Sequence, residues 1–335
     1  MELLIYLILF LLVLIVSSIT NKLLPFLPLP LVQILLGIVI GLFLPNTNFH
    51  LNTELFLALV IGPLLFRESE EADITAILKH WRIIVYLIFP VIFISTLSLG
   101  GLAHLLWFSL PLAACLAVGA ALGPTDLVAF ASLSERFSFP KRVSNILKGE
   151  GLLNDASGLV AFQVALTAWT TGAFSLGQAS SSLIFSILGG FLIGFVTAMT
   201  NRFLHSFLLS VRATDIASEL LLELSLPLVT FFLAEEVHVS GIIAVVVAGI
   251  LKASRFKKIT LLEAQVDTVT ETVWHTVNFM LNGSVFVILG MELEMIAEPI
   301  LTNSIYNPIL LLVSLIALTF VLFAIRFVMI YGYYA

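Results

Sequence analysis

The chain has 335 residues, of which 60% are hydrophobic and only 11% are charged, and its formal net charge is −6. Ordinary soluble proteins carry roughly a quarter charged residues, so this chain has too few polar groups to cover a globular surface. The composition excludes a soluble globular class and predicts a membrane protein. A single cysteine, Cys115, excludes a disulfide framework.

The first apolar run, residues 3–16, resembles a signal peptide, but Glu2 replaces the basic start and no small-residue cleavage site follows. We therefore expect it to be retained as the first membrane helix. A membrane helix needs about 20 apolar residues, and fewer where it tilts, breaks or packs inside protein. Eleven segments fit this description: 3–19, 31–44, 55–66, 82–103, 111–133, 149–171, 183–205, 217–235, 240–251, 273–291 and 309–332.

The basic residues indicate an orientation for these segments. All of the 15 Lys and Arg residues except Arg326 lie at or beyond the ends of odd-numbered segments. Because cytoplasmic loops carry the excess of Lys and Arg, we predict that the N-terminus lies outside and the odd connections inside. The basic run 252–258 is then a cytoplasmic flank, with contact to anionic lipid as an alternative. Arg326 falls inside the last segment, where an arginine requires a buried partner.

Three acidic residues fall inside the expected segments, namely Asp126, Asp155 and, nearer an interface, Glu150. Intramembrane carboxylates are candidates for functional sites by default. The alternative for each aspartate is a structural hydrogen bond or ion pair between helices.

The surroundings of Asp126 favour the functional interpretation. Gly123 and Pro124 interrupt the apolar run 111–133, and proline removes a backbone donor and crowds the carbonyl four residues before it. We expect the helix to break here. Secondary transporters build cation sites from such discontinuous helices, with backbone carbonyls and carboxylates as ligands, and Thr125 adds a hydroxyl beside Asp126.

The next segment carries a second polar group, Asn154 followed by Asp155, with Glu150 one helical turn before Asn154 on the same face. Burial of a carboxylate favours its protonated form, so a proton and a small hard cation compete for the same oxygens. Such competition combined with alternating access produces antiport. The sequence has no Gly-x-x-x-x-Gly-Lys-Ser/Thr loop for ATP, so we expect transport driven by ion gradients, with no cofactor.

These motifs resemble those of a known family. The stretch 123–130, Gly-Pro-Thr-Asp-Leu-Val-Ala-Phe, resembles the Thr-Asp-Pro-Val-Ala motif of NhaP-type bacterial antiporters and the animal sodium/proton exchangers. The stretch 149–156, Gly-Glu-Gly-Leu-Leu-Asn-Asp-Ala, is similar to their Glu-x-x-x-Asn-Asp motif. Residues 63–66, 234–249 and 282–290 are also similar to family motifs, so the resemblance covers nearly the whole chain.

The resemblance implies a role for each motif residue. Asp155 is the central group that carries the ion or the proton, and Thr125 and Asp126 contribute from the broken helix to a sodium site that the three share. Asn154 orients this site. An asparagine before the aspartate also implies electroneutral exchange of one sodium ion for one proton.

The resemblance further implies that Glu150 pairs with Arg326, which supplies the partner that a membrane arginine requires. Three positions depart from the family pattern. Leu127 replaces the usual proline after the aspartate, and Gly151 stands where some members have a serine. Glu68 lies one place beyond the family glutamate that follows Leu-Leu-Phe, and either substitutes for it or belongs to a solvated acidic cluster.

The fold that the resemblance implies is an all-α integral membrane protein with two inverted repeats and discontinuous helices, of which about 11 of an expected 13 transmembrane helices are present. We therefore expect one antiporter domain over 1–335, truncated at its C-terminal end. Within it, 1–66 and 217–291 are dimerisation or scaffold helices, 183–205 is a linking helix, and 82–171 with 309–335 form the ion-translocating core. The family also implies a homodimer in the plasma membrane.

The expected function is exchange of Na⁺ or Li⁺ for H⁺, by a transporter that is not an enzyme and binds no nucleic acid. Several alternatives stay open at this point. One is a potassium/proton antiporter of the same fold. An organic-anion symporter conflicts with the carboxylate pocket, and a channel fits the broken helix less well. An intramembrane aspartyl protease also uses two membrane aspartates, but its Tyr-Asp and Gly-x-Gly-Asp motifs are absent.

Overall fold

The computed structural model describes residues 2–24, 26–43, 52–125, 130, 139–171, 176–211, 215–253, 261–302 and 308–334, some helical positions by their backbone alone. Over these residues the protein is built of helices joined by short connections, without strands.

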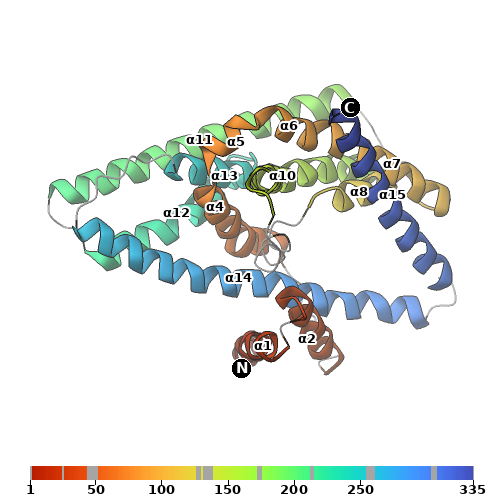
Figure 1. Ribbon diagram of the computed structural model, residues 1–335, viewed down its shortest axis with the longest axis horizontal. Helices are drawn as coiled ribbons and strands as arrows, with labels where there is room; N and C mark the ends of the chain where they lie inside the picture. The colour runs from red at the N-terminus through yellow and green to blue at the C-terminus, as the bar shows by residue number, and fades with distance from the viewer. Residues whose placement is uncertain are drawn as a thin grey trace. The chain divides into compact units, whose positions relative to one another are not determined.

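The helices begin and end as follows (Figure 1): α1 (Glu2–Leu23), α2 (Leu29–Phe43), α3 (Thr53–Phe56), the π-helical turn η1 (Leu57–Ile61), α4 (Gly62–Glu71), α5 (Ile74–Lys79), α6 (Trp81–Tyr86), the π-helical turn η2 (Leu87–Val91), α7 (Ile92–Leu106), α8 (Leu112–Leu122), α10 (Lys141–Thr171), α11 (Leu176–Ser210), α12 (Ile216–Glu236), α13 (Gly241–Ala253), α14 (Leu261–Thr302) and α15 (Pro308–Tyr334).

Each expected segment overlaps these helical stretches, with differences at the ends. Of the expected segment 111–133, residues 126–129 and 131–133 lie outside the described residues. The helix α14 extends well beyond the expected 273–291, because a helix continues through polar flanks that hydropathy does not detect. Within the described part of the chain, five helices are both long and apolar enough to cross a membrane: Trp81–Leu106, Ile184–Ser210, Ile216–Glu236, Thr268–Leu293 and Ile309–Tyr333. The number of membrane crossings stays a prediction.

The helix from Trp81 to Leu106 is continuous but contains the π-helical turn η2, with Pro90 inside it. Proline has no backbone N–H and its ring crowds the carbonyl four residues before it. A wider turn relieves this conflict without ending the helix, which is the usual form of a π-bulge. Pro90 therefore changes the hydrogen bonding of a helix that continues, whereas Pro124 comes after the end of α8.

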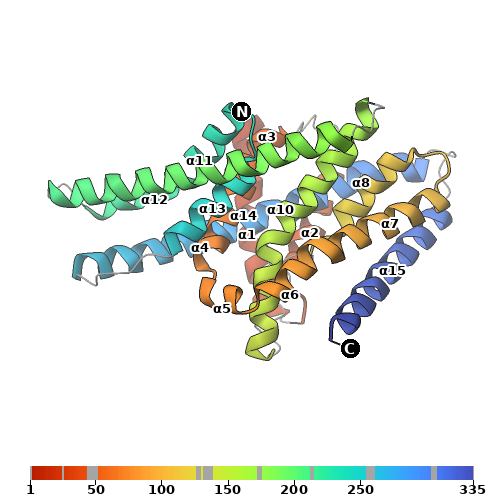
Figure 2. The same cartoon turned by 90° about the horizontal axis from the view of Figure 1, so that it is seen from above.

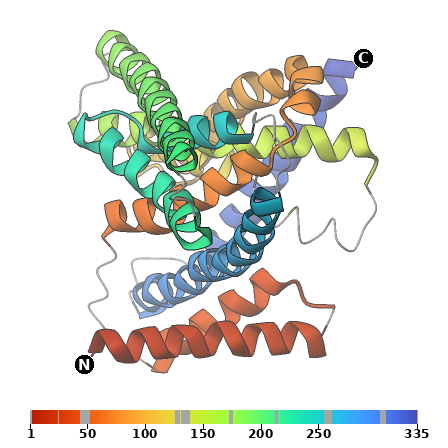
Figure 3. The ribbon, with the colours of Figure 1, turned by 90° about the vertical axis from the view of Figure 1, so that its left-hand side faces the viewer.

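The chain divides into two compact units, each described here by itself. The first unit contains α1 to α4, α11 from Gly189 onward, and α12 to α14. Its α2 packs along α14, with α1 beside them (Figure 3). A Cβ atom on Gly37 would lie 2.2 Å from the Val287 carbonyl oxygen, and one on Gly290 would lie 2.2 Å from that of Ile34. Small residues thus allow the two backbones to approach closely, as is common between membrane helices.

Close backbone contacts at glycine also join other helices of the first unit. A Cβ atom on Gly194 of α11 would lie 2.2 Å from the Ala244 carbonyl oxygen of α13. One on Gly249 of α13 would lie 2.5 Å from the Phe66 carbonyl oxygen of α4. The helix α13 therefore packs closely against both α11 and α4.

The second unit contains α5 to α10, the first part of α11, and α15. Its helix α7 lies between α8 and α15 (Figure 2). Leu99, Cys115 and Leu318, one from each of these helices, are buried together. A second buried cluster joins α6 and η2 to α10 through Ile84, Val91 and Ile146.

Large apolar side chains cover much of the outside. Only 11% of the apolar stretch of α15 is buried within the structure, and Phe320 and Phe327 are among its exposed residues. Exposed apolar patches are typical of surfaces that contact lipid or another protein, so the faces of these helices fit a lipid environment.

Candidate ion-binding site

The candidate site lies in the second unit, where α8 ends. The helix stops at Leu122, immediately before Gly123 and Pro124, where the Gly-Pro pair predicts a break. A helix end leaves backbone carbonyls without partners inside the helix. Here the Gly123 carbonyl accepts a hydrogen bond from the Nη2 atom of Arg326 on α15. The carbonyl at this helix end is therefore paired with a charged side chain from a distant part of the chain.

The helix α10 brings two polar side chains to this break, Glu150 and Asn154, which are one turn apart. Glu150 is 2% exposed and Asn154 is fully buried. A glycine at position 158 allows the approach, because a Cβ atom there would lie 2.2 Å from the Cγ atom of Pro124. The sequence thus combines polar residues on one face of α10 with a glycine where that helix meets the broken segment.

These side chains form one hydrogen-bonded group. Asn154 Nδ2 donates to Thr125 Oγ1 at 2.9 Å, and Thr125 Oγ1 donates to Glu150 Oε1 at 3.3 Å. Asn154 Nδ2 also lies 3.4 Å from Glu150 Oε1. The guanidinium of Arg326 completes the group, with its Nη1 atom 3.3 Å from Glu150 Oε1. Arg326 therefore neutralises Glu150, while Thr125 and Asn154 tie the broken segment to α10.

The two aspartates are described less fully. Asp126 lies outside the described residues. Asp155 follows Asn154 in the continuous backbone of α10, but its side chain lies outside the described part. Glu68 lies half-buried in α4, which belongs to the first unit. Among the described residues, no group of three or more His, Cys, Asp or Glu side chains is placed to hold a metal ion, so the position of a cargo ion stays a prediction.

Two features of this group were not predicted from the sequence. One is the contact between Arg326 and the Gly123 carbonyl, although the Gly-Pro break indicated that a carbonyl would need a partner. The other concerns the Oδ1 atom of Asn154, which is buried and accepts no hydrogen bond from any described residue. A buried acceptor without a donor is uncommon in folded proteins, and such an oxygen is suited to a cation.

A sequence model of the family described as "Sodium/hydrogen exchanger, transmembrane" matches residues 7–334. The chain belongs to this family. The sodium/hydrogen exchanger family consists of cation/proton antiporters, so the chain is a multi-pass membrane protein of a transporter family.

Two curated relatives from Bacillus carry the name "Sodium, potassium, lithium and rubidium/H(+) antiporter". The Bacillus subtilis (strain 168) protein is 37% identical over 312 residues, which are 93% of this chain and 47% of the relative. The Bacillus pumilus (strain SAFR-032) protein is 35% identical over 319 residues, which are 95% of this chain and 48% of the relative. The chain thus spans about half the length of these relatives.

Among solved structures, the chain is similar to the sodium proton antiporter MjNhaP1 from Methanocaldococcus jannaschii at pH 8. The TM-score is 0.67 at 19% sequence identity, over 87% of this chain and 71% of that one. At this identity the likeness establishes the fold alone. The protein therefore has the helical fold of an NhaP-type antiporter over the part that matches.

Proposed function

We propose that the protein is a secondary active antiporter that exchanges Na⁺ or Li⁺ for H⁺ by alternating access. Asp155 is the group to which cation and proton bind in turn, with Thr125 and Asp126 as further cation ligands. The observation that carries the proposal is the buried group in which Thr125, Asn154 and Arg326 surround Glu150 at the broken helix. That group brings hydroxyl and amide oxygens to the point in α10 that Asp155 follows.

The proposal assigns the two acids of α10 different roles, and the charges support the division. Glu150 lies 3.3 Å from the Arg326 guanidinium, so its charge is already matched and an added cation gains little from it. Asp155, the other acid of α10, is then proposed as the group that exchanges a proton for a cation, in keeping with its place in the Asn-Asp motif.

The stoichiometry follows from this division. A single carboxylate that binds either one Na⁺ or one H⁺ has the same total charge in both loaded states. The exchange is then electroneutral, one ion for one proton. The buried Oδ1 atom of Asn154, with no donor among the described residues, is available as a neutral ligand and adds no charge to either state.

A second candidate is exchange of a wider range of monovalent cations, including potassium, on the same fold. It is favoured by the names of the two Bacillus relatives, which include potassium and rubidium as well as sodium and lithium. Selectivity between sodium and potassium depends on cavity size and on the number and strength of the coordinating oxygens.

The test uses the full-length protein in membrane vesicles that carry an imposed pH gradient. Added Na⁺ should dissipate the gradient for the wild type, and Asp155→Asn should abolish this response. Asp215→Asn removes an exposed carboxylate at the start of α12 and should retain it. Normal exchange by Asp155→Asn would refute the central assignment.

Further arms of this assay test cargo and charge. Li⁺ should replace Na⁺, and a response to K⁺ of similar size would favour the second candidate. The rate should not change when a membrane voltage is imposed, because no net charge moves. A clear dependence on voltage would contradict electroneutral exchange.

A further inference from the structure

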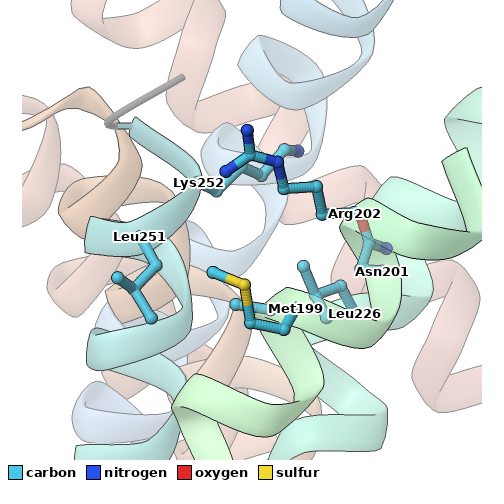
Figure 4. Close-up of a pocket in the computed structure, with 7 residues that line it drawn as sticks. Met199, Asn201, Arg202, Leu226, Leu251 and Lys252 are labelled. Atoms are coloured by element: carbon cyan, nitrogen blue, oxygen red, sulfur yellow. The ribbon is translucent and has the colours of Figure 1, made fainter. Parts of the chain in front are cut away.

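The first unit contains a pocket between α11, α12 and α13. Its polar lining consists of Asn201, Arg202 and Lys252, and its apolar lining includes Met199, Leu226 and Leu251. The Arg202 side chain reaches from α11 toward α13, the helix that carries Lys252 (Figure 4). The pocket thus combines two cationic side chains with an apolar wall.

The two cations of the pocket differ in how far their charges are matched. Lys252 is 9% exposed, and its Nζ atom lies 3.1 Å from Glu70 Oε1 and 2.7 Å from Glu223 Oε1. Arg202 is exposed and forms no ion pair with any residue that the structure describes. The unmatched positive charge of the pocket is therefore that of Arg202.

The apolar wall of the pocket continues onto the outer surface of α11. Met199 lines the pocket and is itself 37% exposed, and the neighbouring Val196 and Phe203 are also exposed. These residues belong to Ile184–Ser210, one of the helices long and apolar enough to cross a membrane. A ligand whose polar group binds Arg202 can therefore place an apolar chain against the exposed apolar surface of α11.

We expect the pocket to lie near a membrane boundary. Arg202 is in the last turn of the expected membrane segment 183–205, although α11 itself continues to Ser210, and Lys252 is in the last turn of α13. Arginine side chains at such positions extend toward the polar interface while their stems cover apolar surface. On this expectation, the guanidinium of Arg202 lies at the height of lipid phosphate groups.

We infer that this pocket binds the headgroup of an anionic phospholipid, with the phosphate on Arg202 and an acyl chain along Met199 and Val196. A guanidinium recognises phosphate through directed hydrogen bonds. A soluble phosphate would use Arg202 but would bury no apolar surface. A zwitterionic lipid would use the wall, but its own cation would compete for its phosphate. An anionic diacyl lipid uses both parts of the pocket.

The experiment measures lipid binding to the purified full-length protein in detergent by native mass spectrometry. The probes are phosphatidylglycerol, phosphatidylcholine with the same acyl chains, glycerol 3-phosphate and inorganic phosphate. Phosphatidylglycerol should bind best, and Arg202→Gln should weaken its binding about fivefold, as expected for one basic residue near an anionic lipid. Arg202→Lys should restore part of the binding.

The matched control is Arg82→Gln. Arg82 is likewise an exposed arginine near the end of a helix long enough to cross a membrane, and its guanidinium lies over the Trp81 ring. This variant should bind phosphatidylglycerol as the wild type does. Equal binding of phosphatidylcholine, or equal loss in the two variants, would overturn the proposal. Binding of inorganic phosphate as tight as that of phosphatidylglycerol would also overturn it and would indicate a site for a soluble anion. Thermal melting without lipid verifies that each variant is folded.

Discussion

Arg326 connects three parts of the second unit through one side chain. Its Nη1 atom lies 3.3 Å from Glu150 Oε1 on α10, and its Nη2 atom donates to the Gly123 carbonyl after α8. Glu150 is 2% exposed, so either charge left without the other would be strongly penalised. The ion pair itself adds little net stability, but each of the two buried charges needs the other to offset the cost of its burial.

This requirement predicts a non-additive mutation series. Glu150→Gln alone and Arg326→Gln alone should each destabilise the protein by about 3–5 kcal/mol, since each leaves one buried charge unpaired. The double variant should be less destabilised than either single variant, because it leaves no buried charge without a partner. Thermal melting of the detergent-purified proteins measures this order. Losses that simply add in the double variant would contradict the coupling.

At the scale of elements, close packing between helices depends on particular glycines rather than on glycine in general. Gly100 and Gly101 are neighbours on α7, but they face different surroundings. A Cβ atom on Gly100 would lie 2.9 Å from the Cα atom of Leu116 on α8, whereas one on Gly101 would have no atom within 4 Å. Only the first glycine is required by the contact between α7 and α8.

The two positions therefore predict opposite effects of the same substitution. Gly100→Ala should destabilise the protein by about 1–3 kcal/mol, since extra atoms in a packed contact force the backbones apart. Gly101→Ala should be neutral or stabilising by up to about 1 kcal/mol, because alanine is the better helix former. The melting temperatures of the two variants measure the difference. Equal destabilisation by both would mean that helix α7 does not pack on α8 as described.

At the scale of the whole molecule, the distribution of basic residues predicts an orientation in the membrane. Val237 lies exposed between α12 and α13, in an even-numbered connection that we expect outside. Lys141 begins α10 and is exposed, in an odd-numbered connection that we expect inside. The only native cysteine, Cys115, is buried, so Cys115→Ala provides a background for labelling.

In that background, a membrane-impermeant maleimide added to intact cells should label Val237→Cys and should leave Lys141→Cys unlabelled. Opening the cells should make both positions reactive, which controls for accessibility of the thiol itself. The prediction rests on the excess of Lys and Arg in cytoplasmic loops. Labelling of Lys141→Cys but not Val237→Cys in intact cells would reverse the proposed orientation.

The sequence by itself determined that this is a helical membrane protein, the family to which it belongs, the approximate positions of its helices and the end of α8 before Gly123. These properties depend on local composition and on the order of motifs, which hydropathy and proline chemistry express directly. It placed helix ends less well, as in α14, because hydropathy stops where lipid contact stops while the backbone hydrogen bonds continue.

The tertiary structure alone decided which groups meet. The contact of Arg326 with the Gly123 carbonyl joins residues 203 positions apart, and no local pattern specifies such a partner. In the same way, Lys252 and Arg202 are both basic residues near helix ends in the sequence. Only the packing of α13 against its neighbours shows that Lys252 is matched by Glu70 and Glu223 and that Arg202 is left exposed. Charge pairing depends on distances between helices, and these arise only when the helices pack.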